Sequence, residues 1–335
     1  MLDFTALSIR LRDAAGVPVI VVPGSCRPMI FEGVSNASAA VALDGEYFLV
    51  FDDEKRNPRI FKWGESDGKG QVDIKRELPN PGGYEFDIEG ATRIGDVIYA
   101  ISSHGLNKRG EALPDRHRII RFRVKSKPDS YELRGKVDCQ QDFLKKLLID
   151  PAYRDLHLDD AAKKRPELGG GINIEGLSAS KHNELLVGFR GPLFGQDPKS
   201  RKALIVTIRN PAEYVAKGRP IFGPPIFLRL GNRGIRDIEL IEDRYFVLAG
   251  PEADETTFAI FTWSGHAHDD PKLLAELDLG GLNGVKPEVL FSFGGIGGIK
   301  LLSDDGDYIA SLYPGVDKIP DSEQRFRAFD VKIEQ

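Results

Sequence analysis

The feature that most constrains the fold of this chain is a degenerate internal repeat. Five segments open on a short apolar run that carries a polar residue, turn, and continue into a second β-rich run. The clearest copies are IEGATRIGDVIYAISSHG and IEGLSASKHNELLVGFRG, and the others are ASAAVALDGEYFLVFDDE, IRDIELIEDRYFVLAGP and KPEVLFSFGGIGGIKLLSDDG. Repeats of this kind indicate one supersecondary unit per copy, each of which buries its apolar faces against its neighbours.

The runs that follow these copies predict four antiparallel strands per unit. PRIFKW and DIKRELPN follow the first copy, RHRIIRFRV and SYELRGKVD the second, ALIVTIRN and PPIFLRLGN the third, and FAIFTWSG and PKLLAELDLGG the fourth. Only QRFRAFDVKI follows the fifth copy. The stretch FTALSIRL, residues 4–11, alternates like a strand and is expected to close this last unit from the N-terminal end.

The spacing of the copies points to insertions in two of them. Ser38, Glu89, Glu175, Asp237 and Glu288 are aligned as corresponding positions, at intervals of 51, 86, 62 and 51 residues. Propeller blades usually repeat every 40–50 residues or so. The longest interval contains an insertion at residues 136–170, between the second and third units, whose apolar spacing predicts a helical segment near 140–165.

A radial arrangement of four-stranded sheets leaves only short, protected edges, whereas an open sheet of this size would expose a long one. The 36 glycines and 21 prolines suit a fold with many turns. We therefore predict an all-β protein in which residues 1–335 form a single β-propeller domain of five four-stranded blades. A six-bladed ring is the alternative.

Composition narrows the partners and the compartment. The formal net charge of −5 argues against a general nucleic-acid binder, which carries a basic contact surface. Apolar runs stay well below the roughly 18 residues of a membrane helix, so no membrane partner is expected. With Cys26 and Cys139 as the only cysteines, the chain lacks a disulfide framework, and we expect a cytoplasmic protein.

The inner strands carry a candidate metal site. In a propeller the first strand of each blade lines the central channel, so Glu89, Glu175, Asp237 and Glu288 are expected to converge at one mouth. Four carboxylates at short range repel each other unless a positive charge is present. A divalent cation such as calcium, which prefers oxygen ligands, is one solution. Asn36, Asp87 and Asn173 are near enough in sequence to complete its shell.

Two other arrangements satisfy the same carboxylates without metal. Arg190, Arg236 and Lys286 lie close to them in the repeat and are able to form ion pairs that neutralise the ring. Alternatively, the carboxylates hydrogen-bond neighbouring blades and hold the ring together, since buried charges require partners.

The ends of the second strands form a second candidate layer. Asp53, Glu54, Ser103 and Glu252 are candidate ligand-binding residues at this rim, together with His104 and Arg190. Arg190 precedes a Gly-Pro turn and is a plausible fixed clamp for a carboxylate or phosphate. His104 is a candidate general base, and its alternative role is a hydrogen bond across the rim.

The combination of these motifs resembles a known family. The stretches NASAAVAL, DDE, IEG, SSH, NIEGL, GFRGP, GIRD and KPE look like the bacterial proteins grouped as domain of unknown function 3616. The resemblance spans nearly the whole chain and implies a propeller-like β fold with no settled activity. More distantly, the layout is similar to the phytase-like esterases and to the gluconolactonase or paraoxonase group, which are calcium-dependent propeller hydrolases.

That distant similarity implies a mechanism for the candidate residues. A cation held by Glu89, Glu175 and Asp237 would polarise a carbonyl or phosphoryl oxygen. Arg190 and Arg236 would hold the anionic part of the substrate, and His104 would activate water. The sequence therefore suggests a metal-dependent hydrolase of a small phosphoester, ester or lactone. The alternative is a non-catalytic propeller that binds a small anion, a peptide or a protein partner.

Overall fold

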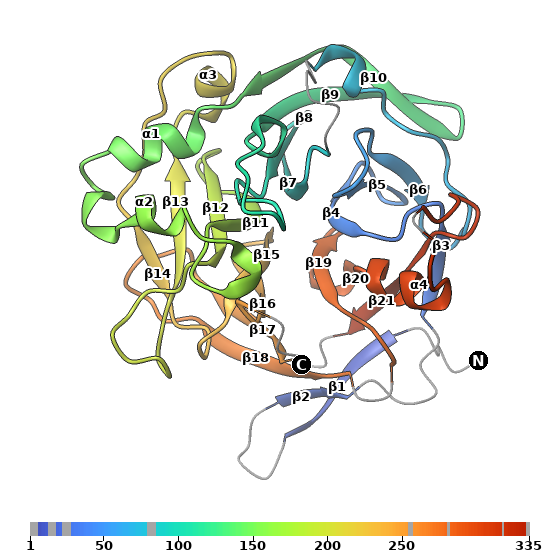
Figure 1. The fold of residues 1–335 in the computed structure, drawn as a ribbon. Coiled ribbons are helices and arrows are strands. Elements are labelled where there is room, and N and C mark those ends of the chain that lie inside the picture. Colours follow the sequence, from blue (N-terminus) through green and yellow to red (C-terminus); the bar gives the residue numbers. More distant parts are fainter. Residues whose placement is uncertain are drawn as a thin grey trace.

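The chain forms a five-bladed β-propeller, in which antiparallel sheets are arranged radially around one axis (Figure 1). The computed structural model describes residues 6–12, 18–21, 28–78, 85–253, 257–279, 282–316 and 318–332. The innermost strands are β4 (Ala37–Ala42), β7 (Ile88–Ile94), β11 (Asn173–Ala179), β15 (Gly234–Ile241) and β19 (Pro287–Ser292). Each inner strand contacts the inner strands of both neighbouring blades, so the ring is closed.

Blades 2, 3 and 4 have the four predicted strands in sequence order. Blade 2 continues from β7 with β8 (Val97–Ser102), β9 (Ile119–Lys127) and β10 (Ser130–Gln140). Blade 3 continues from β11 with β12 (Leu185–Gly191), β13 (Ala203–Ile208) and β14 (Ile226–Leu228). Blade 4 continues from β15 with β16 (Arg244–Gly250), β17 (Phe258–Trp263) and β18 (Lys272–Asp278). The predicted five-bladed fold is confirmed.

Blade 1 departs from the predicted pattern in its outermost segment. Its sheet consists of β4, β5 (Tyr47–Asp52) and β6 (Arg59–Lys62). The stretch at 73–80, expected to be its fourth strand, instead contains the 3-10 helix η1 (Lys75–Glu77), and residues 79–80 lie outside the described part. The Oδ1 atom of Asn57 accepts the backbone N–H of Lys75 at 3.0 Å, which turns the chain there.

Blade 5 is completed from the N-terminal part of the chain, as predicted. It contains β19, β20 (Ile299–Ser303) and β21 (Arg325–Lys332), and β3 (Met29–Glu32) pairs antiparallel with the first half of β21. Strand β1 (Ala6–Arg12), which covers most of the predicted 4–11 strand, pairs in parallel with the second half of β21. Strand β2 (Pro18–Val21) then pairs with β1 and with β18, so the N-terminal segment joins blades 4 and 5.

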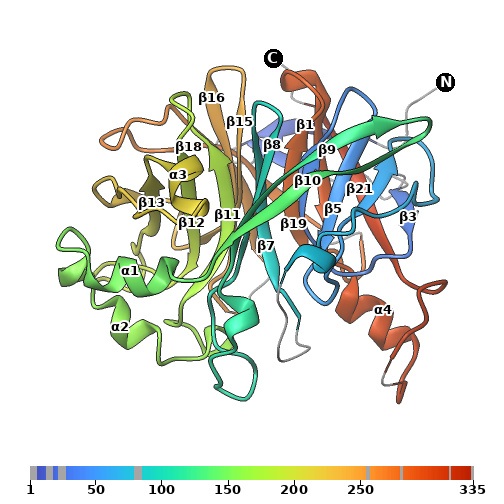
Figure 2. The same cartoon turned by 90° about the horizontal axis from the view of Figure 1, so that it is seen from above.

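The helical excursion lies between blades 2 and 3, where the sequence predicts it. It contains α1 (Phe143–Ile149), η3 (Arg154–Leu156), α2 (Leu158–Ala161) and η4 (Pro166–Leu168), whereas residues 136–140 belong to β10. Phe143 and Leu147 are buried in the apolar cluster of blades 2 and 3, which fixes α1 to the ring. Figure 2 shows α1 and α2 on the same face of the ring as α4 (Gly306–Leu312).

The remaining helices are short. They are η2 (Pro114–Arg116), α3 (Pro211–Val215) and η5 (Ile296–Gly298). In the described part of the chain, no helix has the length and apolar character required to cross a membrane.

Aromatic packing closes the seam between blades 5 and 1. The ring of Phe48 on β5 lies 5.2 Å from that of Phe31 on β3 and 5.2 Å from that of Phe291 on β19, measured between centroids. Aromatic pairs at this separation contribute beyond the apolar area that they bury. The seam therefore holds the last blade, which is built from both ends of the chain, against the first.

Candidate functional site

A β-bulge in each inner strand sets the geometry of the site. The strand register skips one residue between Ala37 and Ala39, Ile88 and Gly90, Ile174 and Gly176, Ile235 and Asp237, and Pro287 and Val289. The skipped residues are Ser38, Glu89, Glu175, Arg236 and Glu288. Because a bulge leaves one residue out of the ladder and redirects its side chain, these five residues form a ring at equivalent places in the blades.

The bulge corrects the sequence alignment of blade 4 by one residue. Asp237, predicted to belong to the carboxylate ring, lies just beyond the bulge, and Arg236 occupies the equivalent place. The two carboxylate oxygens of Asp237 accept the backbone N–H groups of Ile238 and Leu290, each at 2.8 Å. Asp237 thus ties β15 to β19. The aligned motifs IEG and IRD contain this signal, since Arg follows Ile in blade 4 where Glu follows Ile in blades 2 and 3.

Blades 3, 4 and 5 contribute a charge-balanced half of the ring. Nη1 of Arg236 lies 2.5 and 2.6 Å from the carboxylate oxygens of Glu288, and 3.2 Å from Oε2 of Glu175. Oε1 of Glu175 accepts hydrogen bonds from Nη1 of Arg190 at 2.9 Å and from Nδ2 of Asn173 at 2.8 Å. Ion pairing with protein cations, one of the two metal-free alternatives, therefore accounts for Glu175 and Glu288.

Blades 1 and 2 contribute an acid-rich half. One carboxylate oxygen from each of Asp53, Asp87 and Glu89 lies within 4.8 Å of the others. Asp87 is buried and accepts hydrogen bonds from Arg116 and Ser103. Oδ1 of Asp53 is buried and has no hydrogen-bond partner among the described residues. The cluster thus has three carboxylates and one directly paired cation.

Burial and the excess of negative charge in this half raise the pKa values of some of its carboxyl groups. Burial, followed by the charges of Asp304 and Asp52, raises the pKa of Asp53 well above its usual range. Burial, followed by the charges of Asp87 and Asp53, does the same to the pKa of Glu89. Burial also raises the pKa of Asp304 to about 6. The acid-rich half, and Asp53 and Glu89 above all, therefore gains from a bound proton or a bound cation.

A cavity of about 190 Å³ separates the two halves. It is lined by Asn36, Ser38, Asp53, Glu89, Arg116, Pro166, Glu167, Asn173, Glu175, Arg190, Glu288 and Asp304. Pro166 and Glu167 come from η4, so the insertion between blades 2 and 3 forms part of the cavity wall. Arg190 is held there by the hydrogen bond from its Nε to the carbonyl of Pro251 at 2.9 Å, in addition to its pair with Glu175.

His104 lies apart from the residues that line this cavity. It is buried, and its ring packs edge to face against the rings of His117 and Phe143, with centroids 5.3 Å away in each case. Its Nδ1 lies 2.8 Å from the carbonyl oxygen of Ser102, which sits on the same strand end and not across the rim. Burial, followed by the charge of His117, lowers its pKa to about 3, so the imidazole is neutral at physiological pH.

The other residues predicted to lie at the rim are found in different environments. Ser103 is buried and orients Asp87, whereas Glu54 is exposed and lies outside the cavity lining. Oε1 of Glu252 accepts the backbone N–H groups of Gly170 at 2.9 Å and Leu193 at 3.1 Å, and its Oε2 pairs with Arg201 at 2.8 Å. Glu252 therefore anchors the end of the insertion, and Asp53 is the predicted ligand-binding residue that reaches the cavity.

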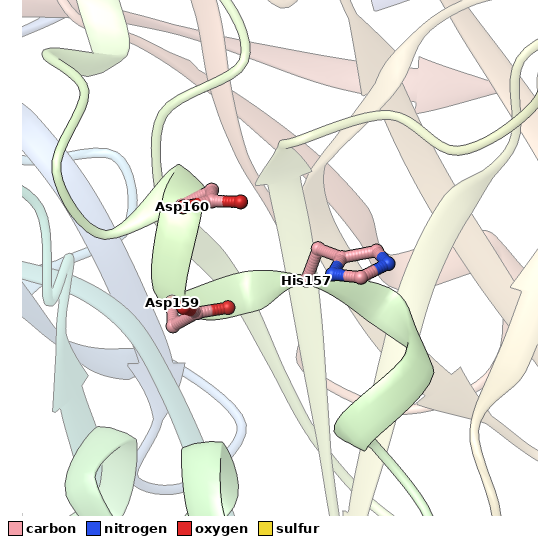
Figure 3. A group of neighbouring side chains, drawn as sticks. All are labelled: His157, Asp159 and Asp160. Carbon is pink, nitrogen blue, oxygen red and sulfur yellow. The ribbon is translucent and has the colours of Figure 1, made fainter.

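A second group of possible metal ligands lies on the insertion. His157, Asp159 and Asp160 place ligand atoms within 4.8 Å of one another, and Figure 3 shows the two carboxylates on α2 and the imidazole on the turn that precedes it. All three residues are exposed, and Lys163 lies 3.6 Å from Asp159 and 3.0 Å from Asp160. Lys163 thus pairs with both exposed carboxylates, whereas Oδ1 of Asp53 in the other cluster has no hydrogen-bond partner among the described residues.

Comparison with known proteins places the chain in a family. A sequence model described as "Protein of unknown function (DUF3616)" matches residues 113–283, about half of the 335 residues. The chain belongs to this family. A search of curated proteins found no match.

Several solved structures are similar in fold to this chain, and two of them are enzymes. One is the PQQ-bound form of aldose sugar dehydrogenase from Streptomyces coelicolor, with 12% identity and a TM-score of 0.43 over 91% of this chain and 98% of that one. Another is a GH43_1 enzyme from Xanthomonas citri, with 11% identity and a TM-score of 0.45 over 91% of this chain and 95% of that one. Similarities this distant carry no information about the activity of the chain.

Proposed function

We propose that the protein binds a divalent cation at Asp53, Asp87 and Glu89 and hydrolyses a small phosphoester, ester or lactone in the adjoining cavity. The observation that carries the proposal is the surplus of carboxylates on one side of a polar cavity whose other side presents a fixed arginine. A surplus of buried negative charge requires compensation, and the bulge ring supplies none for Glu89.

The residues present fit a hard cation. Calcium takes six to eight oxygen ligands, and the three clustered carboxylates supply its preferred donor type. Asp304 and Asn36 line the same cavity and are further oxygen donors. Arg116, which also lines the cavity, and Ser103 hold the Asp87 carboxylate by hydrogen bonds, the kind of support that carboxylate ligands usually receive. When bound, the cation would polarise a carbonyl or phosphoryl oxygen.

Arg190 is the residue that we assign to the anionic part of the substrate. Its guanidinium lines the cavity, and its contacts with Pro251 and Glu175 fix its orientation before any ligand arrives. A planar, oriented guanidinium suits bidentate recognition of a carboxylate or phosphate. Arg236, in contrast, is occupied by Glu175 and Glu288 and is assigned a structural role.

The location of His104 favours a second candidate function. A general base must reach the water that it activates, and His104 is buried against α1 and absent from the cavity lining. The proposal therefore does not use His104. A propeller that binds a small anion through a cation and Arg190, without turnover, requires no base at all.

The decisive experiment is calorimetric titration of chelator-treated protein with calcium and with magnesium. Wild type and Asp159→Asn, which changes the exposed group on α2, are expected to bind one ion with equal affinity. Glu89→Gln is expected to weaken binding at least about tenfold, because it removes one charged ligand from the cluster of Asp53, Asp87 and Glu89. Equal binding by Glu89→Gln and wild type would exclude this cluster as the metal site.

Activity separates the two candidate functions once an ion is shown to bind. Wild type would be assayed with 4-nitrophenyl phosphate, 4-nitrophenyl acetate and a γ-lactone, in the presence of the ion and of chelator. Hydrolysis that depends on the ion and is lost in Glu89→Gln supports the enzyme. Ion binding with no turnover of any of the three substrates supports the binding propeller.

A further inference from the structure

A second and larger concavity lies beside the central cavity, between blade 1 and the segment that follows β20. Its volume is about 560 Å³. Its polar wall comes from residues just after β5 and from η1, and its other wall comes from α4 and the loop after it. We call this concavity the lateral groove. Of its lining residues, the repeat pattern singles out Asn36 and Glu54 but none of the cationic ones.

The lateral groove has more cationic than acidic side chains among its described lining residues. The cationic ones are Lys55, Arg56, Arg59, Lys75 and Lys318, and the acidic ones are Glu54, Asp307 and Asp321. Asp307 is already paired, at 2.5 Å, with Lys286, which does not line the groove. The net charge that the groove presents to a ligand is therefore positive.

Some charged side chains of the groove are ion-paired, and others are not. Lys55 and Arg59 hold Asp321 at 3.4 and 2.6 Å, so these three form a fixed network. The ammonium groups of Lys75 and Lys318 have no ion-pair or hydrogen-bond partner among the described residues, and both side chains are exposed. Two ammonium groups on opposite walls of one groove are thus available for an anion.

The wall opposite blade 1 is partly apolar. Ala310, Val316 and Ile319 line it, and Val316 is 48% exposed. A ligand that fills the groove would cover this apolar surface while it contacts the lysines. A purely polar ion such as inorganic phosphate would leave the apolar wall in water.

The lateral groove adjoins the central cavity. Asn36 lines both, and Asp53 of the cavity is followed directly in the chain by Glu54 of the groove. A molecule bound in the groove therefore has one end close to the acid-rich half of the bulge ring.

We propose that the lateral groove binds a small organic anion that has an apolar part, such as an aryl or alkyl phosphate or carboxylate. Lys75 and Lys318 contact the anionic group, and Val316 contacts the apolar part. Anion binding in the groove requires neither the cation nor turnover, so this proposal stands independently of the proposed function.

The test is calorimetric titration with phenylphosphonate, an aryl anion that cannot be hydrolysed at a P–O–C bond, and with benzoate, which carries a carboxylate instead. Wild type is expected to bind at least one of the two. The double variant Lys75→Ala with Lys318→Ala is expected to bind that probe at least about fivefold more weakly, because two charge-assisted contacts are lost. Lys145→Ala, an exposed lysine on α1, is the matched control and is expected to bind as wild type does.

Two further arms examine the apolar wall and the link to the cavity. Inorganic phosphate is expected to bind more weakly than phenylphosphonate, and Val316→Ser is expected to narrow that difference. Glu89→Gln is expected to bind the probe as tightly as wild type does in chelator. This variant separates failure of the metal site from failure of the groove.

The proposal is overturned if neither probe binds to wild type. It is also overturned if the double lysine variant binds the probe with unchanged affinity, or if inorganic phosphate binds as tightly as phenylphosphonate. Melting temperatures of the variants, measured alongside, identify any loss of binding that comes from unfolding.

Discussion

The two halves of the bulge ring use the same backbone position for different purposes. In blades 3, 4 and 5, Glu175, Arg236 and Glu288 alternate in charge, so that one arginine pairs with the carboxylates of both neighbouring blades. In blade 2, Glu89 lies near Asp53 and Asp87 and forms no ion pair with any described residue. The difference teaches that a repeated position in a propeller is defined by the bulge, whereas its role is defined by the charge of its neighbours.

This contrast has an energetic meaning. A buried ion pair contributes little net stability, but removal of one partner leaves an uncompensated buried charge and is strongly destabilising. In the balanced half, the ion pairs already compensate every carboxylate of the ring. The acid-rich half has an excess of negative charge, which a ligand or a proton can still relieve.

The largest expected effect is that of Arg236→Met. The substitution keeps a long side chain against Phe258 but leaves Glu175 and Glu288 without their shared cation. We expect a loss of about 3–5 kcal/mol in the free energy of unfolding, measured by urea denaturation. Arg123→Met, which breaks an exposed pair with Asp96, is the control and is expected to change stability little. Equal losses in the two variants would contradict a structural role for the balanced half.

An intermediate effect is expected for Asp237→Asn. Both carboxylate oxygens of Asp237 accept backbone N–H groups, and the amide nitrogen of asparagine is unable to accept either of them. We expect a loss of about 1–3 kcal/mol in the free energy of unfolding, with calcium affinity unchanged. If calcium affinity instead falls as in Glu89→Gln, Asp237 belongs to the metal site and not to the link between blades 4 and 5.

The smallest expected effect is a pH dependence of the free energy of unfolding of the metal-free, chelator-treated protein. A carboxyl group whose folded pKa is raised binds its proton more tightly in the folded state, so the folded state loses stability as pH rises from the ordinary value toward the raised one. For Asp304 this window runs from about 4 to about 6, and for Asp53 and Glu89, whose pKa values burial raises well above their usual range, the loss of stability has the same sign. We expect a loss on the order of 1 kcal/mol between pH 5 and pH 7, and a smaller loss with calcium bound.

The control for this measurement is Asp53→Asn, which removes one of the clustered acids. Burial also raises the pKa values of Asp52 and Asp237 to about 7, so wild type alone does not isolate the cluster. The difference in pH dependence between wild type and Asp53→Asn isolates the contribution of the cluster. Identical pH profiles for the two proteins would show that the acid-rich half does not hold protons in the way that its geometry indicates.

Much of the architecture could be predicted from the sequence because it is local. The alternation of short apolar runs with turns specifies strands, and five copies of that pattern specify the blades. The apolar spacing around Phe143 and Leu147 likewise specifies α1. The expected fourth strand of blade 1 fails at Lys75 because Asn57, far from it in the pattern, captures its backbone N–H group.

The candidate site was predicted less completely. The repeat identified Glu89, Glu175 and Glu288 as members of one ring, and it identified Arg190 as a fixed cation. It did not show that Asp237 turns to the backbone of the next blade, or that His104 is covered by α1. Each of these outcomes depends on a residue in another blade or in the insertion, which a pattern along one strand does not contain.

The sequence by itself thus determined most of the strands, the five repeat units and the ring positions of Glu89, Glu175 and Glu288, since all of these follow from periodicity and turn residues. Only the tertiary structure decided which carboxylates are neutralised and which remain in excess. The reason is that charge compensation acts through space over a few ångströms. Arg236 reaches Glu288 across 52 positions of the chain, while Asp53, Asp87 and Glu89 come together from two blades and, among the described residues, have one paired cation, Arg116 on Asp87.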